Sequence, residues 1–422
     1  MIIFRRMQSL TFLSICILTV FGCAAYKPHP MEEVPFLERA QTKIENNVRV
    51  TAAVPSAKES KTLFDVNLYR RGIQPIWLEI ENSDEEPVWF LPLGLDPNYF
   101  TPFETSYMNH FIYSLYANRA NQAMDRHFYD QGKGIYIDPG KVKSGFIFTN
   151  LDEGTKEFIV DLIGEDHEVR TFTFFISVPG LRADHRKVDF ETLYPADEIV
   201  SYDEEGLKRA LENVPCCTTN KKGTEQGDPL NLVVIGDEED VFHAFIRAGW
   251  DETETIYTTS AWKTGVSFIF GGRYRYSPVS PLYVYGRSQD VALQKARDTI
   301  HERNHLRLWL APMRFEGKPV WIGQISRDIG VRFSKKTIVT HKIDADVDET
   351  RDYLIQDLWY SQGLERFAYV KGVGAARMSE PRGNLTGDPY FTDGLRVVLW
   401  VTRKFIDFED VEFGEWEVPP QQ

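Results

Sequence analysis

The sequence predicts a mixed fold: an N-terminal all-β domain resembling an immunoglobulin-like sandwich with a helical insertion, followed by a C-terminal α+β domain. Short β-branched and aromatic runs dominate residues 61–181. Helical and extended patterns then mix over residues 229–405. The length of 422 residues fits two domains, and 42% hydrophobic residues suit globular folding.

The N-terminus predicts export and lipid attachment. Arg5 and Arg6 precede an apolar stretch that is too short and too polar to span a bilayer, so residues 1–22 are typical of a signal peptide. The stretch ends in Val20-Phe21-Gly22-Cys23, which resembles the lipobox of bacterial lipoproteins. That resemblance implies cleavage before Cys23 and lipidation of its thiol. The alternative is an ordinary signal peptide with a chance cysteine.

The segment that follows predicts a tether. Residues 23–60 are polar, contain scattered prolines and show no sustained period, which is typical of a linker that holds a domain away from a membrane. Ala24, rather than an aspartate, follows the cysteine. By resemblance to lipoprotein sorting, this favours the outer membrane, with the protein facing the periplasm.

The first domain, residues 61–181, consists mostly of expected strands. Ile76, Leu78 and Ile80 alternate with more polar neighbours, as in a half-buried strand. The stretch from Thr101 to Asp125 interrupts the strands with aromatic residues at helical spacing, and it predicts the helical insertion. No residues in this domain have catalytic spacing.

The vicinal pair Cys216-Cys217 lies in residues 182–228, a charged, irregular segment that we expect to be the linker between the domains. An oxidising periplasm permits a disulfide, but bonding adjacent residues strains the intervening peptide. Two buried free thiols are the alternative. The pair predicts no redox function.

The second domain, residues 229–405, alternates expected helices and strands and is followed by a tail, residues 406–422. Helices are expected from Asp237 to Ala248 and at two later segments, Asp290–Ile300 and Asp348–Trp359. Extended segments are expected at Pro281–Tyr285, Leu306–Leu310, Val320–Ile325 and Leu395–Val401.

The charge balance excludes one class of partner. The chain has 48 Lys and Arg against 62 Asp and Glu, a formal charge of −14, and no cluster of basic residues offsets it. Such a chain repels phosphate backbones, so we expect no nucleic-acid binding.

His301-Glu302-Arg303-Asn304-His305 matches H-E-x-x-H, the helical zinc motif of metallopeptidases. That motif needs an uninterrupted helix, whereas Leu306, Leu308 and Leu310 begin a period-two pattern directly behind it. We therefore expect a strand. Its other face then presents Arg303, His305 and Arg307, a grouping suited to a carboxylate or phosphate. The alternative is a solvated face whose arginines pair with nearby acids.

A second histidine and several acids follow the expected hairpin. His341 and Asp344 are candidate partners for His305. The acids of Asp344-Ala345-Asp346-Val347-Asp348 do not form a calcium loop, because Glu349 occupies the position that requires glycine. Asp346 and Asp348 instead fit the start of the following helix.

Several segments carry a resemblance to a known family. They are Cys216-Cys217-Thr218-Thr219-Asn220, Gly227-Asp228-Pro229-Leu230-Asn231, Gly286-Arg287-Ser288-Gln289-Asp290, Asn304-His305-Leu306-Arg307-Leu308-Trp309 and His341-Lys342-Ile343-Asp344-Ala345-Asp346-Val347-Asp348. In this order they resemble the LssY C-terminal domain family. Larger relatives place this domain beside membrane-embedded lipid-phosphate phosphatase and DedA-type domains, which implies work in the envelope or on lipids. The resemblance transfers no catalytic residues.

The leading hypothesis is a lipid-anchored envelope protein that binds an anionic small molecule or an envelope partner. The rival is a hydrolase acting on an anionic or phosphorylated substrate. In it, His305 and His341 are acid/base groups or metal ligands, Asp344 orients one of them, and the anion is held by Arg287, Arg303 and Arg307. A third hypothesis is a purely structural lipoprotein. The sequence identifies no cofactor.

Overall fold

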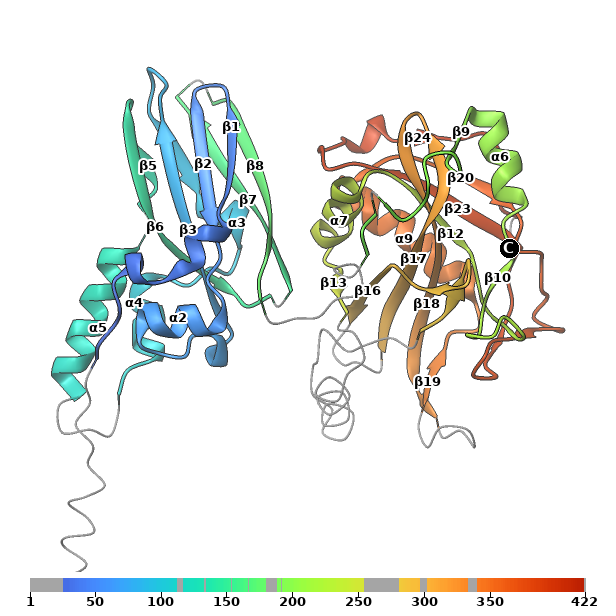
Figure 1. The fold of residues 1–422 in the computed structure, drawn as a ribbon, viewed down its shortest axis with the longest axis horizontal. Coiled ribbons are helices and arrows are strands. Elements are labelled where there is room, and N and C mark those ends of the chain that lie inside the picture. Colours follow the sequence, from blue (N-terminus) through green and yellow to red (C-terminus); the bar gives the residue numbers. More distant parts are fainter. Residues whose placement is uncertain are drawn as a thin grey trace, which may run out of the picture. The chain divides into compact units, whose positions relative to one another are not determined.

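The computed structural model describes residues 26–111, 117–132, 134–152, 154–165, 167–179, 188–190, 192–253, 281–296, 302–332 and 340–420. The chain divides into two compact units, the first ending at Leu181 and the second beginning at Arg182. Both combine helices with strands (Figure 1), so the expected mixed fold class is confirmed. In the described residues, no helix is long and apolar enough to cross a membrane.

Two four-stranded antiparallel sheets share one apolar core in the first unit. One sheet has the order β1-β2-β3-β6, with β1 Gln41–Glu45, β2 Val48–Ala53, β3 Ile73–Asn82 and β6 Lys141–Asn150. The other has the order β5-β4-β7-β8, with β5 Tyr136–Ile137, β4 Val88–Leu91, β7 Thr155–Gly164 and β8 Val169–Ser177. The alternating residues predicted from sequence, Ile76, Leu78 and Ile80, all lie in this core.

Helices gather at one end of these sheets (Figure 1). They are α2 Ala57–Phe64, α4 Pro102–Met108 and α5 Ala117–Gln131, whereas the short α3 Pro92–Leu95 lies beside β7. The 3₁₀ turns of this unit are η1 Met31–Glu33, η2 Pro35–Arg39 and η3 Tyr69–Arg71. The expected helical insertion is therefore present as α4 and α5. Thr101 and Glu104 form a capping box at the start of α4, which satisfies backbone donors there.

The expected tether is folded from Tyr26 onwards. The Tyr26 hydroxyl lies 2.6 Å from Nδ1 of His127 on α5. The amide of Lys27 donates to Asp65, and the amide of His29 donates to the carbonyl of Thr62. The prolines that suggested a linker lie among short 3₁₀ turns and at strand ends, where a missing N–H costs little.

A ten-stranded sheet forms the centre of the second unit. Its path is β13-β16-β17-β18-β12-β23-β20-β24, while β19 pairs with β18 and β9 with β17. The strands are β9 Val200–Tyr202, β12 Leu232–Ile235, β13 Asp251–Glu252, β16 Val291–Ala296, β17 Glu302–Phe315, β18 Lys318–Arg332, β19 Thr340–Ile343, β20 Leu364–Lys371, β23 Leu395–Val401 and β24 Glu412–Phe413.

Smaller elements cover this sheet. The helices are α6 Glu204–Glu212, α7 Glu238–Arg247, α9 Val347–Tyr360 and the 3₁₀ turn η5 Phe408–Asp410. A small sheet has the order β11-β10-β14-β15, with β10 Cys217–Thr219, β11 Gln226–Pro229, β14 Tyr283–Val284 and β15 Arg287–Ser288. A two-stranded ribbon pairs β21 Arg382–Gly383 with β22 Pro389–Tyr390.

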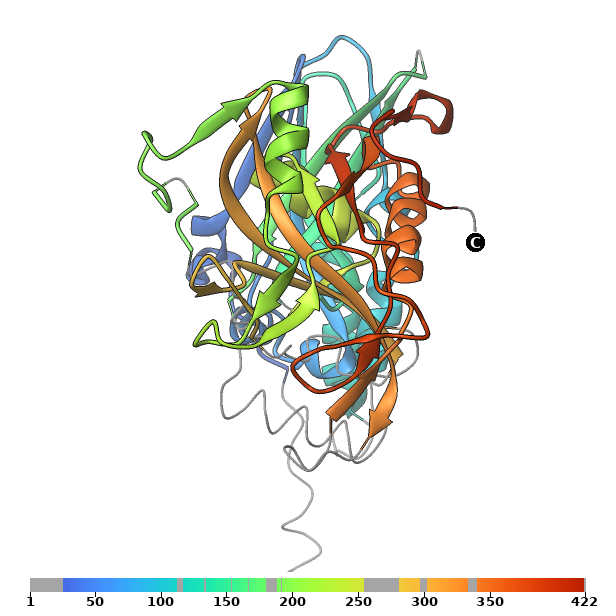
Figure 2. The same cartoon turned by 90° about the vertical axis from the view of Figure 1, so that its right-hand side faces the viewer.

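The face of the large sheet that carries Trp309 and Ile322 shares a core with Leu207 of α6 and Val284 of the small sheet. In Figure 2, α6 and the strands β10 and β11 of the small sheet, all green, lie in front of the long strands β17 and β18. Helix α9 covers the opposite face, because Arg327 of β18 lies over the ring of Tyr353.

Two expectations for this unit need correction. Residues 182–228 are not simply a linker: they contain β9, α6, β10 and part of β11 within the second unit. The segment Asp290–Ile300 is not a helix where it is described, since Val291–Ala296 form β16 and pair along β17. Tertiary pairing there overrides the helix-forming tendency of Leu, Gln, Lys and Ala.

Candidate functional site

The most unusual feature of the second unit is a buried polar face on β17 and β18. The register pairs Arg303 with Asp328, His305 with Ser326, and Arg307 with Gln324. Because cross-strand partners lie on the same face and alternate residues share it, these six side chains form one group. All are buried, including Arg303 at 4% and Arg307 at 5% exposure. We call this group the polar face.

The strand predicted for this segment is present, and Leu306 and Leu308 are buried on its other side. Since β17 begins at Glu302, the described part of the H-E-x-x-H sequence is extended instead of helical, which excludes the helical zinc motif. His301 lies outside the described residues. Within the described ranges, no three His, Cys, Asp or Glu side chains are grouped so as to hold a metal ion.

Hydrogen bonds connect the six side chains and recruit Gln294 of β16. Nε of Arg303 donates to Oδ2 of Asp328 at 3.0 Å, and its Nη1 donates to Gln294. Nη1 of Arg307 donates to Oε1 of Gln324 at 2.7 Å. Nε2 of Gln324 in turn donates to the hydroxyl of Ser326 at 2.8 Å. The arginines thus have fixed partners inside the fold.

His305 lies between Ser326 and Asp328. Its Nε2 is 3.0 Å from the Ser326 hydroxyl, and its Nδ1 is 3.5 Å from Oδ2 of Asp328. Because the Ser326 oxygen accepts from Gln324, its proton is best directed to Nε2 of a neutral His305. That tautomer places a proton on Nδ1, facing the carboxylate. The arrangement can pass a proton from the serine to the imidazole.

A buried acid outside the two strands, Asp228, interacts with the polar face. Burial raises the pKa of Asp228 on β11. The positive charge of Arg307 opposes this rise in pKa, and the negative charges of Asp328 and Asp388 add to it. Nδ2 of Asn384 donates to Oδ1 of Asp228 at 2.9 Å. Sequence reasoning missed Asp228 and Asp328 as site residues, although Asp228 belongs to one of the segments that carried the resemblance.

Arg287 lies in a different group. Its guanidinium contacts both carboxylate oxygens of Asp290 and the hydroxyl of Tyr194. It also donates to the carbonyl of Leu310, whose amide donates to Asp290. These bonds connect β15 to β17, whereas Arg303 and Arg307 donate to Asp328 and Gln324 of β18.

The register does not bring His341 beside His305. His341 pairs with Val331, whereas His305 pairs with Ser326. Five residues of strand separate the two positions by roughly 16 Å along β18. The amide of Asp344 donates to the carbonyl of Arg327, and Oδ1 of Asp344 accepts from the amide of Asp346, which caps α9. The side chain of His341 and all of Cys23 lie outside the described residues.

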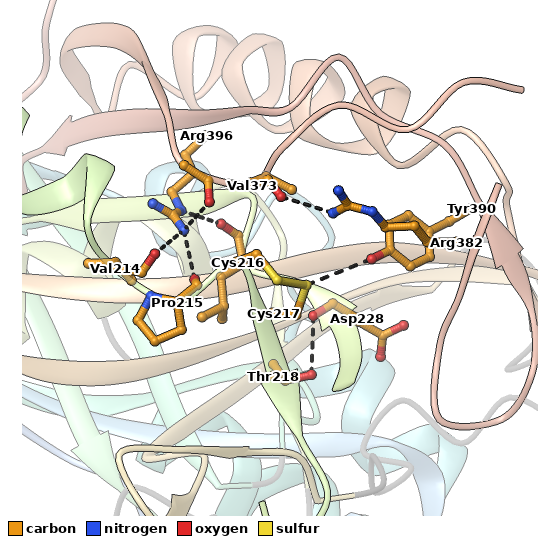
Figure 3. The surroundings of a disulfide bond; sticks show 12 residues. Val214, Pro215, Cys216, Cys217, Thr218, Asp228, Val373, Arg382, Tyr390 and Arg396 are labelled. Atoms are coloured by element: carbon orange, nitrogen blue, oxygen red, sulfur yellow. Dashed lines mark hydrogen bonds between the residues drawn. A yellow bond between two sulfur atoms is a disulfide. The ribbon is translucent and has the colours of Figure 1, made fainter. Parts of the chain in front are cut away.

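A disulfide joins Cys216 and Cys217 at the start of β10 (Figure 3). Sγ of Cys217 lies 3.8 Å from the Tyr390 hydroxyl. Beside it, the fully buried Arg396 donates to backbone carbonyls on several segments, namely those of Leu211, Val214, Pro215, Leu230 and Gly372. Burial lowers the pKa of Arg396 to about 10, so the guanidinium is still charged at neutral pH. Arg396 thereby fixes the segment that carries the disulfide.

Comparison with known proteins agrees with the resemblance found in the sequence. No curated protein matches the chain. Residues 209–395, which include the disulfide and the polar face, match the family model described as LssY C-terminus. The second unit of this chain therefore contains an LssY-like C-terminal domain.

Proposed function

We propose that this protein is a lipid-anchored component of the bacterial outer membrane, facing the periplasm, whose LssY-like domain binds an anionic small molecule at the polar face. The lipobox-like ending at Cys23 supports the anchor. The first unit, with two antiparallel sheets around one core, supports an immunoglobulin-like sandwich. Such a module is suited to positioning the second unit in the envelope or contacting an envelope protein.

One observation supports ligand binding above the structural alternative: two arginines and a histidine are buried side by side on one strand. Burying charged groups costs free energy, and buried ion pairs stabilise folds less than apolar packing does. A cluster of this kind is more typical of a site than of a scaffold. Guanidinium groups are also the side chains best suited to phosphate and carboxylate oxygens.

Titration with inorganic phosphate and glycerol phosphate tests this proposal. We expect calorimetry to detect binding to the full chain, and we expect Arg307→Gln to weaken it by about tenfold or more, since a charge-assisted donor is lost. Arg377→Gln is the matched control, because Arg377 is exposed. Circular dichroism verifies that both variants fold. An absence of binding heat in the wild type would reject the anion site.

A hydrolase is the second candidate, and the contacts of His305 favour it. Ser326 at Nε2 and Asp328 at Nδ1 are arranged as nucleophile, base and orienting acid are in acyl transfer. In such a step the Ser326 oxygen attacks the acyl carbon of the substrate while His305 takes the hydroxyl proton, and Asp328 stabilises the imidazolium. His305 then returns that proton to the departing group as its bond to the acyl carbon breaks. His305 keeps its predicted role as acid and base, whereas Asp328 takes the orienting role expected of Asp344.

A fluorophosphonate probe, which reacts with activated serines, tests this candidate. We expect the wild type to be labelled at Ser326 and Ser326→Ala to be unlabelled, with His305→Gln slowing the reaction about a hundredfold or more through loss of the base. Ser326 is 1% exposed, so labelling also tests whether a substrate can reach it. Peptide mapping that finds Ser326 unmodified would remove the hydrolase from consideration.

A further inference from the structure

The lipid anchor and the folded chain lie very close together in sequence. Tyr26 is already packed against the helical end of the first unit, and its hydroxyl contacts His127 of α5. Cys23 is three residues earlier. A chain of three residues reaches at most about 11 Å, which is comparable to the diameter of one helix. An acylated Cys23 therefore holds the surface around α5 against the bilayer.

The helices at this end expose aromatic side chains. Among the described residues of the first unit, three aromatic side chains are more than half exposed: Phe103 at 56%, Tyr107 at 74% and Tyr129 at 64%. All three lie on α4 and α5. Phe103 and Tyr107 are four residues apart and share one face of α4, and the rings of Phe103 and Tyr129 are 5.6 Å apart. We call these three residues the aromatic surface.

Aromatic side chains of this kind favour the headgroup region of a bilayer, where an apolar ring and a polar hydroxyl are both accommodated. The exposed side of α5 also carries Arg119 and Arg126 against Asp130. The chain as a whole has a net charge of −14, but this face has both signs of charge, so anionic phospholipid repels it less than it would repel a uniformly acidic face.

We propose that the aromatic surface of α4 and α5 lies in the headgroup region of the membrane to which Cys23 is attached. The inference rests on the proposed lipid anchor and adds an orientation to it. The first unit then contacts the membrane directly instead of extending from it on a long tether. The bilayer covers a surface that would otherwise expose three aromatic rings to water.

Nitroxide labels on the full acylated chain test this orientation. The chain is reconstituted into vesicles of phosphatidylethanolamine and phosphatidylglycerol, with a label at Tyr107→Cys or Tyr129→Cys. The matched control is Ile44→Cys, at an equally exposed position (65%) on β1 of the same unit, at the end of the sheets away from these helices (Figure 1). We expect the nitroxides at positions 107 and 129 to collide with a water-soluble nickel chelate about fivefold less often than the control nitroxide does, because the membrane excludes the chelate. We expect them to collide more often with dissolved molecular oxygen, which enters the bilayer.

Intact mass, measured first, separates the two proposals. A chain that begins at Cys23 and carries acyl groups, with loss of acylation in Cys23→Ser but not in Cys16→Ser, supports the anchor. A chain without acyl groups overturns both the anchor and the orientation. If the chain is acylated but the nickel chelate reaches the labels at Tyr107 and Tyr129 as readily as the label at Ile44, the anchor stands and the orientation is wrong.

Discussion

Replacing Arg396 with methionine is expected to lower the free energy of unfolding of the second unit by about 4 kcal/mol. Arg396 is 0% exposed, and its guanidinium donates to five backbone carbonyls. Methionine fills a similar volume but donates nothing, so these buried oxygens lose their partner. Their segments include the end of α6 and the chain entering the disulfide (Figure 3).

Urea unfolding followed by tryptophan fluorescence measures this effect, because seven of the nine tryptophans lie in the second unit. Arg396→Lys keeps the charge but cannot reach several carbonyls at once, so we expect it to recover only part of the loss. The control is Arg366→Met, which removes an ion pair with the half-exposed Glu204 and is expected to cost less than about 1 kcal/mol. If Arg396→Met lowers the free energy of unfolding no more than Arg366→Met does, the hydrogen bonds of Arg396 do not stabilise the second unit as expected.

Much of the second unit could be predicted because its strands follow simple periods. Leu306, Leu308 and Leu310 predicted the strand that became β17, and Leu395–Val401 were predicted as an extended segment with the bounds of β23. The helix predicted from Asp237 to Ala248 likewise matches α7, whose N-cap and C-cap are these two residues. In each case the signal is local, since a strand alternates and a helix needs caps.

Which residues make up the polar face was less predictable, because this depends on the register in which β17 pairs with β18. Sequence placed Arg303, His305 and Arg307 on one face but suggested partners further along the chain, His341 and Asp344. The hairpin register instead places Ser326 and Asp328 opposite them. A turn length fixes which residues of two strands face each other, and one residue of slippage exchanges the two faces. A period-two pattern alone contains no such information.

Long-range packing explains the remaining differences. Residues 182–228 contain many charged residues and were expected to be a linker, yet α6 buries Leu207 and Leu211 against the large sheet. The segment from Tyr26 to Ser60 is rich in proline, yet its first part packs on the helices of the first unit and its second part forms β1 and β2. In both segments the apolar residues are interspersed with charged residues and prolines, and which of them are buried becomes evident only when the surface they contact is known.

The buried pair of Arg303 and Asp328 offers the second large effect. Their exposed fractions are 4% and 2%, and Nε of Arg303 lies 3.0 Å from Oδ2 of Asp328. We expect Arg303→Met to cost about 3–5 kcal/mol in the free energy of unfolding, because it leaves a carboxylate buried with one fewer cation beside it. Asp328→Leu is expected to cost a similar amount, since it removes the partner of a buried guanidinium.

The double variant, Arg303→Met with Asp328→Leu, distinguishes a structural pair from a functional one. Two apolar side chains of similar volume leave no unpaired charge, so we expect the double variant to be more stable than either single variant, with a coupling of about 2 kcal/mol or more. Urea unfolding of all four proteins measures it, with the exposed pair Arg403 and Glu239 as the control cycle, expected below about 1 kcal/mol. A coupling free energy between Arg303 and Asp328 no larger than that of the control pair would contradict a strong interaction between the two buried charges. If the double variant folds stably but no longer binds phosphate, the pair is retained for ligand binding rather than for the stability of the sheet.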